Sequence, residues 1–239
     1  MNNKWIIAFF DGSDSVKELH GFLQPEFCRL FGPDVMTNET CVVFNDPTSE
    51  CPMLITNKSP VMIRLSQVRP NCWAQTVYQL SHEMCHYAFR QKKADKDFTL
   101  KWMEETICEA VSLYALEYCA QNWNKCLLAK RDLGYSRALV SYLCDELLRE
   151  YKNGLMACRA IEQLEAIEKD ADEKREERRR ERNELYYAIS RNPTECVHLL
   201  DLYQYVNQDK LTINFEAWEK DNPANLIRCL GRIQPVLEE

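Results

Sequence analysis

Two histidines and a glutamate in the first half of the chain have the types and the spacing that hydrolytic zinc chemistry requires. The segment from His82 to His86 reads His-Glu-Met-Cys-His and matches the pattern H-E-x-x-H. On a helix, residues four apart lie on one face, so both imidazoles can reach one Zn²⁺. Glu83 is then placed to act as general base toward a water molecule held by the metal. The alternative interpretation is an ordinary helix that carries two polar histidines.

The residues around this motif predict a helix that begins near Asn71. Pro70 provides a stop and Asn71 an N-cap, and the polar stretch 91–97 predicts a loop after the helix. Cys85 points to a different face from the two histidines. Five apolar residues recur at helical spacing and predict a buried face beside the histidines: Trp73, Val77, Leu80, Met84 and Ala88.

A second helix, from about residue 99 to residue 120, carries the best candidates for a third metal ligand. A catalytic zinc site commonly has three protein ligands and one open position for water. Glu105 and Glu109 are four apart and share a face of this helix, distinct from its apolar stripe. Two carboxylates near a core are costly unless a positive group lies opposite, and Zn²⁺ with a ligating histidine would supply one. The alternative is that both glutamates face water, as Glu usually does. The stripe consists of Met103, Ile107, Ala110 and Tyr114.

Other side chains qualify for a role on residue type alone. His20 and His198 are potential ligands without a supporting local pattern, and each is interpreted as a lone surface or core histidine. A second electrophile, typically Tyr or His, often assists such chemistry. The candidates by type are Tyr87, Tyr114, Tyr118 and His198.

The spacing His82-Glu83-x-x-His86, eighteen further residues and then Glu105 resembles the gluzincin branch of the zincin metallopeptidases. The resemblance implies that His82, His86 and Glu105 are the zinc ligands and that Glu83 is the base. It also implies that Glu109 holds the first histidine from outside the ligand set, although the family usually has Asp at that position. The stretch 105–110 is also similar to the ligand helix of ImmA/IrrE-type bacterial peptidases, compact zincins that cleave transcriptional repressors. The similarity covers about residues 70–120, and no helix-turn-helix signature accompanies it, so the repressor substrate is not carried over.

The elements that must position these residues predict an α+β fold that is mostly helical. We expect a small N-terminal sheet packed on the H-E-x-x-H helix, which is a minimal zincin core, over residues 1–120. We expect residues 121–239 to form a helical C-terminal region that packs on this core or extends from it. A chain of 239 residues suits one large domain or two small ones.

The region before the motif reads as strands and one helix. Short β-branched and aromatic runs predict strands at 42–44, 53–56 and 61–65, and the apolar run 5–10 predicts a first buried strand. A helix is expected at about 16–31. The strand 61–65 comes just before the motif helix. It is interpreted either as an edge strand that pairs with an extended substrate or as an ordinary internal strand.

The C-terminal half predicts further helices at about 122–132, 135–152, 155–190 and 194–207, separated by Gly134, Asn153-Gly154 and Asn192-Pro193. The stretch 168–184 consists almost entirely of charged residues. It predicts an exposed helix with a solvated face, and the alternative is an arm that binds a protein partner. The apolar residues after Leu211 predict a tail that folds back and packs: Phe215, Trp218, Leu226, Ile227, Leu230 and Ile233.

Composition restricts the class of protein. The formal net charge is −7, whereas nucleic-acid-binding proteins usually carry an excess of positive charge. No stretch reaches the length of a transmembrane helix, and the N-terminal apolar run is too short for a signal peptide. The chain has twelve cysteines and no C-x-x-C pair, which favours free thiols in a reducing cytoplasm. Five of them are expected in helices, as small buried apolar residues: Cys85, Cys108, Cys119, Cys144 and Cys158.

These observations favour a cytoplasmic zinc metallopeptidase that binds one Zn²⁺ per chain and acts on a protein or peptide, without nucleic acid or membrane as a partner. Two alternatives remain open. One is a non-catalytic helical interaction protein with a degenerate or structural metal site. The other is a zinc hydrolase of a non-peptide substrate, because the site specifies hydrolysis better than it specifies the bond that is cleaved.

Overall fold

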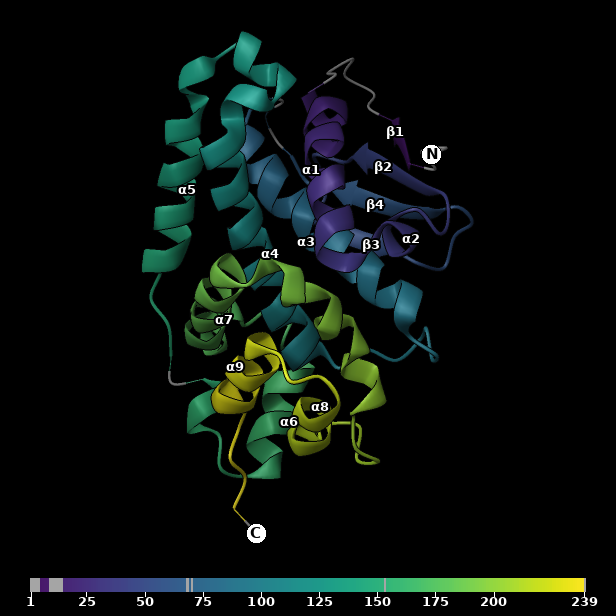
Figure 1. The fold of residues 1–239 in the computed structure, drawn as a ribbon, viewed down its shortest axis with the longest axis vertical. Helices are drawn as coiled ribbons and strands as arrows, with labels where there is room; N and C mark the ends of the chain where they lie inside the picture. The colour runs from purple at the N-terminus through teal and green to yellow at the C-terminus, as the bar shows by residue number, and fades with distance from the viewer. Residues whose placement is uncertain (1–4, 9–14, 68, 70, 153, 239) are drawn as a thin grey trace. The chain divides into compact units, whose positions relative to one another are not determined.

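The computed structural model describes the whole chain except residues 1–4, 9–14, 68, 70, 153 and 239. The protein is mostly helical (63%), with a small four-stranded mixed sheet near the N-terminus and a helical C-terminal part. Figure 1 shows the strands and the first helices in purple and blue, and the helices of the C-terminal part in green and yellow. The predicted α+β class is therefore confirmed.

The sheet has the strand order β1-β2-β4-β3. Strands β1 (Trp5–Ala8), β2 (Cys41–Asn45) and β4 (Val61–Leu65) run parallel, and β3 (Met53–Ile55) pairs with β4 in the antiparallel direction. Alternate residues of β4 are buried, as expected for a strand with one face on the core. All four strands were predicted, although residues 9 and 10 of the first apolar run lie outside the described residues.

The order of the strands corrects the prediction that residues 61–65 form an edge strand. β4 is hydrogen-bonded to β2 on one side and to β3 on the other, so its backbone groups are already paired. The ordinary internal strand is the interpretation that the structure supports. Hydrophobic alternation identifies a strand but contains no information on its neighbours, which is why the sequence left both interpretations open.

Two long helices pack against this sheet. The indole of Trp5 on β1 lies against the rings of His20 on α1 (Ser15–Phe31) and Tyr87 on α3 (Trp73–Lys92), with ring centroids 4.8 and 4.9 Å away. Gln79 of α3 accepts a hydrogen bond from the backbone N–H of Ser66, just after β4 (3.1 Å). The predicted packing of the sheet on the motif helix is thus confirmed.

The end of α1 explains a short element that was not predicted. Gly32 follows α1 with a φ of 95°, a conformation that glycine adopts without a steric penalty. Its N–H donates to the carbonyl of Cys28 (3.0 Å), and the chain then forms the single turn α2 (Pro33–Met36).

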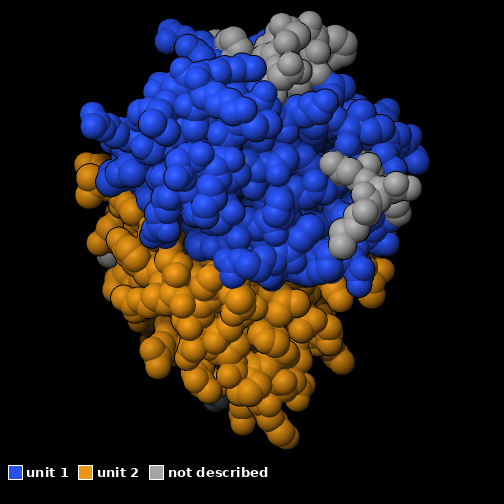
Figure 2. Space-filling model, turned by 45° about the horizontal axis from the view of Figure 1, so that its top comes forward, with its two compact units in different colours: residues 1–91, 112–146 blue, residues 92–111, 147–239 orange. Residues whose placement is uncertain are grey.

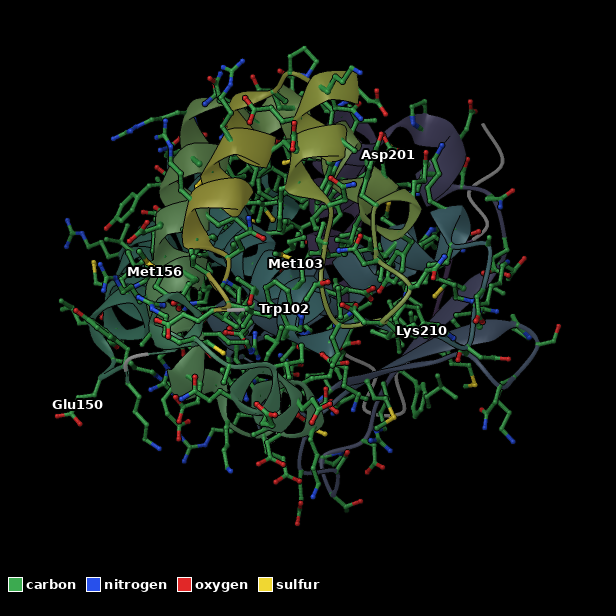
Figure 3. All side chains as sticks on the ribbon, turned by 90° about the horizontal axis from the view of Figure 1, so that it is seen from below. Trp102, Met103, Glu150, Met156, Asp201 and Lys210 are labelled. Atoms are coloured by element: carbon green, nitrogen blue, oxygen red, sulfur yellow. The ribbon has the colours of Figure 1, made fainter. Side chains whose placement is uncertain are left out.

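Helix α4 (Lys101–Asn122) is buried on nearly all sides, and the predicted apolar stripe is only one part of its buried surface. Trp102, for example, lies in the interior among the helices of the C-terminal part (Figure 3), and its indole N–H donates to the carbonyl of Leu211 (2.9 Å). A helix this enclosed needs a partner for every polar side chain that it carries.

The remaining C-terminal elements are more broken than predicted. Two 3₁₀ turns replace the helix expected at 122–132 and a third follows them, and α5 confirms the helix expected at 135–152. The region 155–190 is not one helix, because 3₁₀ turns and a loop interrupt it, and a 3₁₀ helix replaces the one expected at 194–207. These elements are η1 (Trp123–Lys125), η2 (Leu127–Lys130), η3 (Leu133–Tyr135), α5 (Ser136–Leu148), η4 (Leu155–Ala157), α6 (Ile161–Lys169), η5 (Arg175–Glu177), α7 (Arg179–Arg191) and η6 (Pro193–Gln204).

The C-terminal tail packs as predicted. It forms α8 (Phe215–Asp221) and α9 (Asn225–Ile233), and its six apolar residues are all buried. Each of the twelve cysteines is a thiol, with no disulfide among the described residues. The prediction of buried helical thiols was wrong for Cys144, which is exposed, and Cys158 lies just outside a helix.

The chain forms two compact units, which Figure 2 shows in blue and orange. Unit 1 comprises residues 1–91 and 112–146, and unit 2 comprises residues 92–111 and 147–239. The first half of α4 thus belongs to unit 2 and the second half to unit 1. The boundaries of these units differ from the predicted boundary at residue 120. The assignment of residues 1–120 as a zincin core and of residues 121–239 as a C-terminal region stays a prediction. Among the described helices, none has both the length and the apolar composition that a bilayer crossing needs.

Candidate metal centre

The middle part of the helix that carries the motif is accessible to solvent at one position. From Thr76 to Phe89, a span that is described throughout, every residue of α3 is buried except His86. The predicted core face of α3 is confirmed. His82 and Glu83 are 4% and 3% exposed. The motif therefore lies in the protein interior, and solvent reaches it at its last residue.

Helix α4 shows the same property. From Trp102 to Leu116, again described throughout, every residue is buried except Glu105. Exposed glutamates are common on proteins, but a single accessible glutamate within a buried stretch of fifteen residues is unusual.

The structure brings these residues together. One ligand atom from each of His82, His86 and Glu105 lies within 4.8 Å of the other two. The Nε2 atoms of the two histidines are 3.1 Å apart, and their rings are close to perpendicular, at 75°. The three residues that the sequence selected as ligands are thus neighbours in space.

The geometry of the group fits a tetrahedral metal ion. Zinc binds histidine nitrogen at about 2.0–2.1 Å, which puts two nitrogens of a tetrahedral site about 3.4 Å apart, close to the observed 3.1 Å. Glu105 must approach by at most about 1.5 Å, which a change of side-chain rotamer can supply, because this side chain is not enclosed. Two histidines and one glutamate are a ligand set of catalytic zinc sites. The residues present therefore fit the predicted metal.

Glu109 is paired with buried arginines. Its carboxylate is fully buried and accepts a hydrogen bond from the guanidinium of Arg178 (Nη2–Oε1 3.2 Å), which is also fully buried. Arg182 and Arg175 are 3.6 and 3.8 Å from the same carboxylate. The interpretation that Glu109 faces water was wrong, and its predicted hydrogen bond to His82 stays a prediction.

The same contacts correct the prediction for residues 168–184. This stretch is not an exposed helix with a solvated face, because Arg178, Glu181 and Arg182 are at most 1% exposed. The physical reason is the buried carboxylate of Glu109, which attracts guanidinium groups into the interior. Charge alternation at helical spacing could not reveal a partner 69 residues earlier in the chain.

Two further groups on unit 2 were not predicted. Glu104 forms an ion pair with Lys93 (2.8 Å), accepts a hydrogen bond from the hydroxyl of Tyr203, and is almost fully buried. The ammonium group of Lys93 lies 4.5 Å from the centre of the Tyr203 ring. Glu168 accepts hydrogen bonds from the first backbone N–H groups of α4. The contacts of Tyr203 and Glu168 join residues more than sixty positions apart, and no local sequence pattern predicts them or the Lys93–Glu104 pair.

The remaining candidates have other partners. His20 is a core histidine, as one interpretation predicted, and burial lowers its pKa to about 4. His198 lies 2.9 Å from the side chain of Asn222. The hydroxyl of Tyr87 donates to the carbonyl of Glu39 (2.9 Å), and burial raises its pKa to about 12.

Tyr114 donates to Glu26, and the ring of Tyr118 lies 5.6 Å from that of Phe22. These contacts do not test whether either tyrosine acts as an electrophile, and that role stays a prediction.

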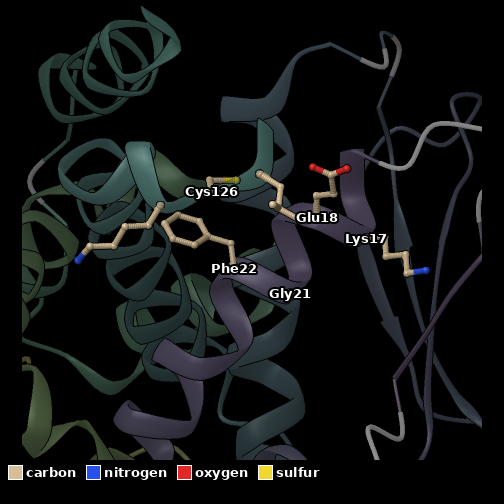
Figure 4. A pocket seen from close by; sticks show the side chains of 7 residues that line it. Lys17, Glu18, Gly21, Phe22 and Cys126 are labelled. Carbon is tan, nitrogen blue, oxygen red and sulfur yellow. The ribbon is translucent and has the colours of Figure 1, made fainter. Parts of the chain in front are cut away.

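Unit 1 has a surface pocket in which the first turns of α1 face residues 125–127. Phe22, Leu127 and Cys126 supply apolar walls, and Figure 4 shows that the amine of Lys17 points away from the Phe22 ring. Ligand sites usually combine an apolar wall with polar groups that converge on one point. The labelled polar side chains of this pocket do not converge, so we assign no chemistry to it.

Comparisons with protein-family models, with curated proteins and with solved structures find no match to this chain. The assignment of a function therefore depends on the chain's own residues and their arrangement.

Proposed function

We propose that the protein is a zinc-dependent peptidase of the cytoplasm, with His82, His86 and Glu105 as ligands and Glu83 as general base. One observation carries the proposal. Two long helices are buried for fourteen and fifteen successive residues except at His86 and Glu105, and these two residues meet at His82. If α3 and α4 served only to fill the protein core, there would be no advantage in leaving one residue of each helix accessible to solvent within the same group.

The residues have distinct tasks in this proposal. A bound Zn²⁺ polarises the scissile carbonyl and lowers the pKa of water. Glu83 is buried beside the ligands, where its carboxylate takes a proton from the attacking water and delivers it to the nitrogen of the leaving amine. His86 and Glu105 form the accessible side of the site, which is the side from which a substrate carbonyl approaches.

Substitutions at the motif test the proposal. We expect about one zinc ion per wild-type chain by elemental analysis after dialysis, and loss of that zinc in His86→Ala. Glu83→Gln should keep the zinc and lose cleavage of casein or a peptide library about 10²–10⁴-fold. His198→Gln is the matched control, because this histidine contacts Asn222 in unit 2 and should affect neither zinc nor turnover.

The outcome also separates the alternatives. Zinc that depends on His86, together with a peptide library that stays uncleaved while a small ester or amide is hydrolysed, favours a hydrolase of non-peptide substrates.

The helical interaction protein has one observation in its favour. The 3.1 Å between the two histidine nitrogens also suits a hydrogen bond between neutral imidazoles, which needs no metal. In that case wild-type protein holds no zinc. The exposed charges of residues 168–184, such as Lys174 and Arg180, would then offer the partner-binding surface. Pull-down with these residues reversed in charge tests that reading, and zinc bound at His86 contradicts it.

A further inference from the structure

We propose that residues 168–182 form a brace that holds the ligand Glu105 in position, with Glu168 and Arg178 as positioning residues. The inference rests on the proposed function, because it concerns how the zinc site is kept in shape. It assigns an internal task to the charged stretch that the sequence alone presented as surface.

The first contact of the brace is at the beginning of α4. The first N–H groups of a helix have no partner within the helix, and a carboxylate near them also interacts favourably with the helix dipole. Glu168 supplies that carboxylate: its Oε1 accepts from the backbone N–H of Lys101 (3.0 Å) and its Oε2 from that of Trp102 (2.8 Å). Both oxygens are used, so the first turn of α4 is fixed to the end of α6.

The second contact is one turn after Glu105. Arg178 donates to the carboxylate of Glu109 (3.2 Å), to the hydroxyl of Thr106 (3.4 Å) and to the carbonyl of Ala171 (2.6 Å). Arg178 and Glu109 are both fully buried. Removing one partner of a buried pair leaves the other as an uncompensated charge, so this contact resists any movement that would separate them.

The two contacts bracket the ligand. Glu105 lies four residues after Lys101 and four before Glu109, so one helical turn on each side of it is held by the brace. Its neighbours are held as well, Glu104 by Lys93 (2.8 Å) and Thr106 by Arg178. Rotation or sliding of this part of α4 would break all of these contacts together. Glu105 itself, in contrast, is the one accessible residue between Trp102 and Glu109.

The chain has a specific feature that lets the brace form. Gly154 approaches the backbone so closely that a Cβ built there would lie 1.3 Å from the carbonyl oxygen of Glu177, next to Arg178. The backbone N–H of Lys152 donates to the carbonyl of Glu176 (3.0 Å) and fixes the same turn. Only glycine permits this approach, which seats Arg178 at the beginning of α7.

The test measures metal affinity on the full chain. Zinc affinity is obtained by competition with a chromogenic chelator, and the ligand geometry from the visible spectrum of the Co²⁺ form. Arg178→Met should weaken zinc about 10- to 100-fold and change the Co²⁺ spectrum, because partners outside a ligand set typically affect affinity on that scale. Arg178→Lys keeps the charge and should recover part of the loss. Arg180→Met is the matched control, since Arg180 pairs with Glu184 at the surface and should behave as wild type.

A double-mutant cycle separates positioning from general loss of stability. If Arg178 acts through Glu105, Arg178→Met should have no further effect on zinc affinity in a Glu105→Ala background. Should Arg178→Met fail to fold by circular dichroism, Glu168→Gln is the second variant. It keeps one oxygen acceptor, and it should weaken zinc in the same direction by a smaller factor.

The outcomes are distinct for the two proposals. The brace is overturned if folded Arg178→Met and Glu168→Gln bind zinc as tightly as wild type, or if Arg178→Met costs as much without Glu105 as with it. In both cases the peptidase proposal stands. A wild-type chain that binds neither Zn²⁺ nor Co²⁺, or binds them independently of His86, overturns both proposals.

Discussion

The buried histidine of unit 1 leads to a quantitative prediction about stability in acid. His20 is 2% exposed and lies against the Trp5 ring, and burial lowers its pKa from 6.5 to about 4. In the unfolded chain the imidazole binds a proton near pH 6.5, whereas in the folded chain it stays neutral down to about pH 4. The unfolded state therefore binds more protons in this window, and stability must fall as the pH falls.

The size of the effect follows from the shift. A difference of about 2.5 pKa units at about 1.4 kcal/mol per unit gives a loss of about 3 kcal/mol between pH 6.5 and pH 4. The contribution is nearly constant above about pH 7.5 and levels off again about one pH unit below the folded pKa. A loss of this size is a large part of the 5–15 kcal/mol that stabilises a typical protein.

Urea denaturation at several pH values between 4 and 8 measures this loss, with chelator present so that no metal contributes. His20→Phe keeps an aromatic ring against Trp5 and removes the titrating group. The difference in unfolding free energy between wild type and His20→Phe should change by about 3 kcal/mol across the window, because other titrating groups cancel in the difference. A difference in unfolding free energy that does not change with pH would refute the assignment of a neutral buried imidazole.

Three further predictions concern stability and thiol reactivity. Glu109→Gln leaves Arg178 without its carboxylate and should lower the unfolding free energy by about 3–5 kcal/mol in thermal or urea denaturation, whereas Glu184→Gln at the surface should cost less than about 1 kcal/mol. Gly154→Ala should destabilise by more than about 3 kcal/mol, because its Cβ would meet the Glu177 carbonyl; Gly21→Ala, where a Cβ meets nothing, is the comparison. Burial raises the pKa of Cys119, so it should react with a thiol reagent at pH 8 far more slowly than exposed Cys51; equal rates, read by mass spectrometry of the labelled peptides, would contradict this burial.

The spacing of apolar residues along the chain correctly predicted helices and strands whose formation depends mainly on neighbouring residues. The apolar repeat of α3, from Trp73 to Ala88, identified its core face, and β-branched runs identified β2 and β4. The position of β4 inside the sheet was not predictable, because the pairing of strands depends on the packing of the whole sheet. The expectation of one helix at 155–190 failed for a related reason. No glycine or proline interrupts that stretch, and its break depends on a contact with Glu109, far away in the sequence.

The three carboxylates in the first half of α4 show where reasoning from the sequence succeeded and where it stopped. The argument that buried carboxylates need positive partners holds for Glu104, which has Lys93, and for Glu109, which has Arg178. Glu105 is only half-buried and lies beside the two imidazoles, and a metal as its partner stays a proposal. What the sequence could not decide was which partner belongs to which carboxylate, because a lysine, an arginine and a metal satisfy the same electrostatic demand. Accessibility separates them. The ion pairs of Glu104 with Lys93 and of Glu109 with Arg178 are buried, whereas Glu105 is accessible to solvent. A substrate must be able to reach a catalytic site, and a purely structural ion pair has no such requirement.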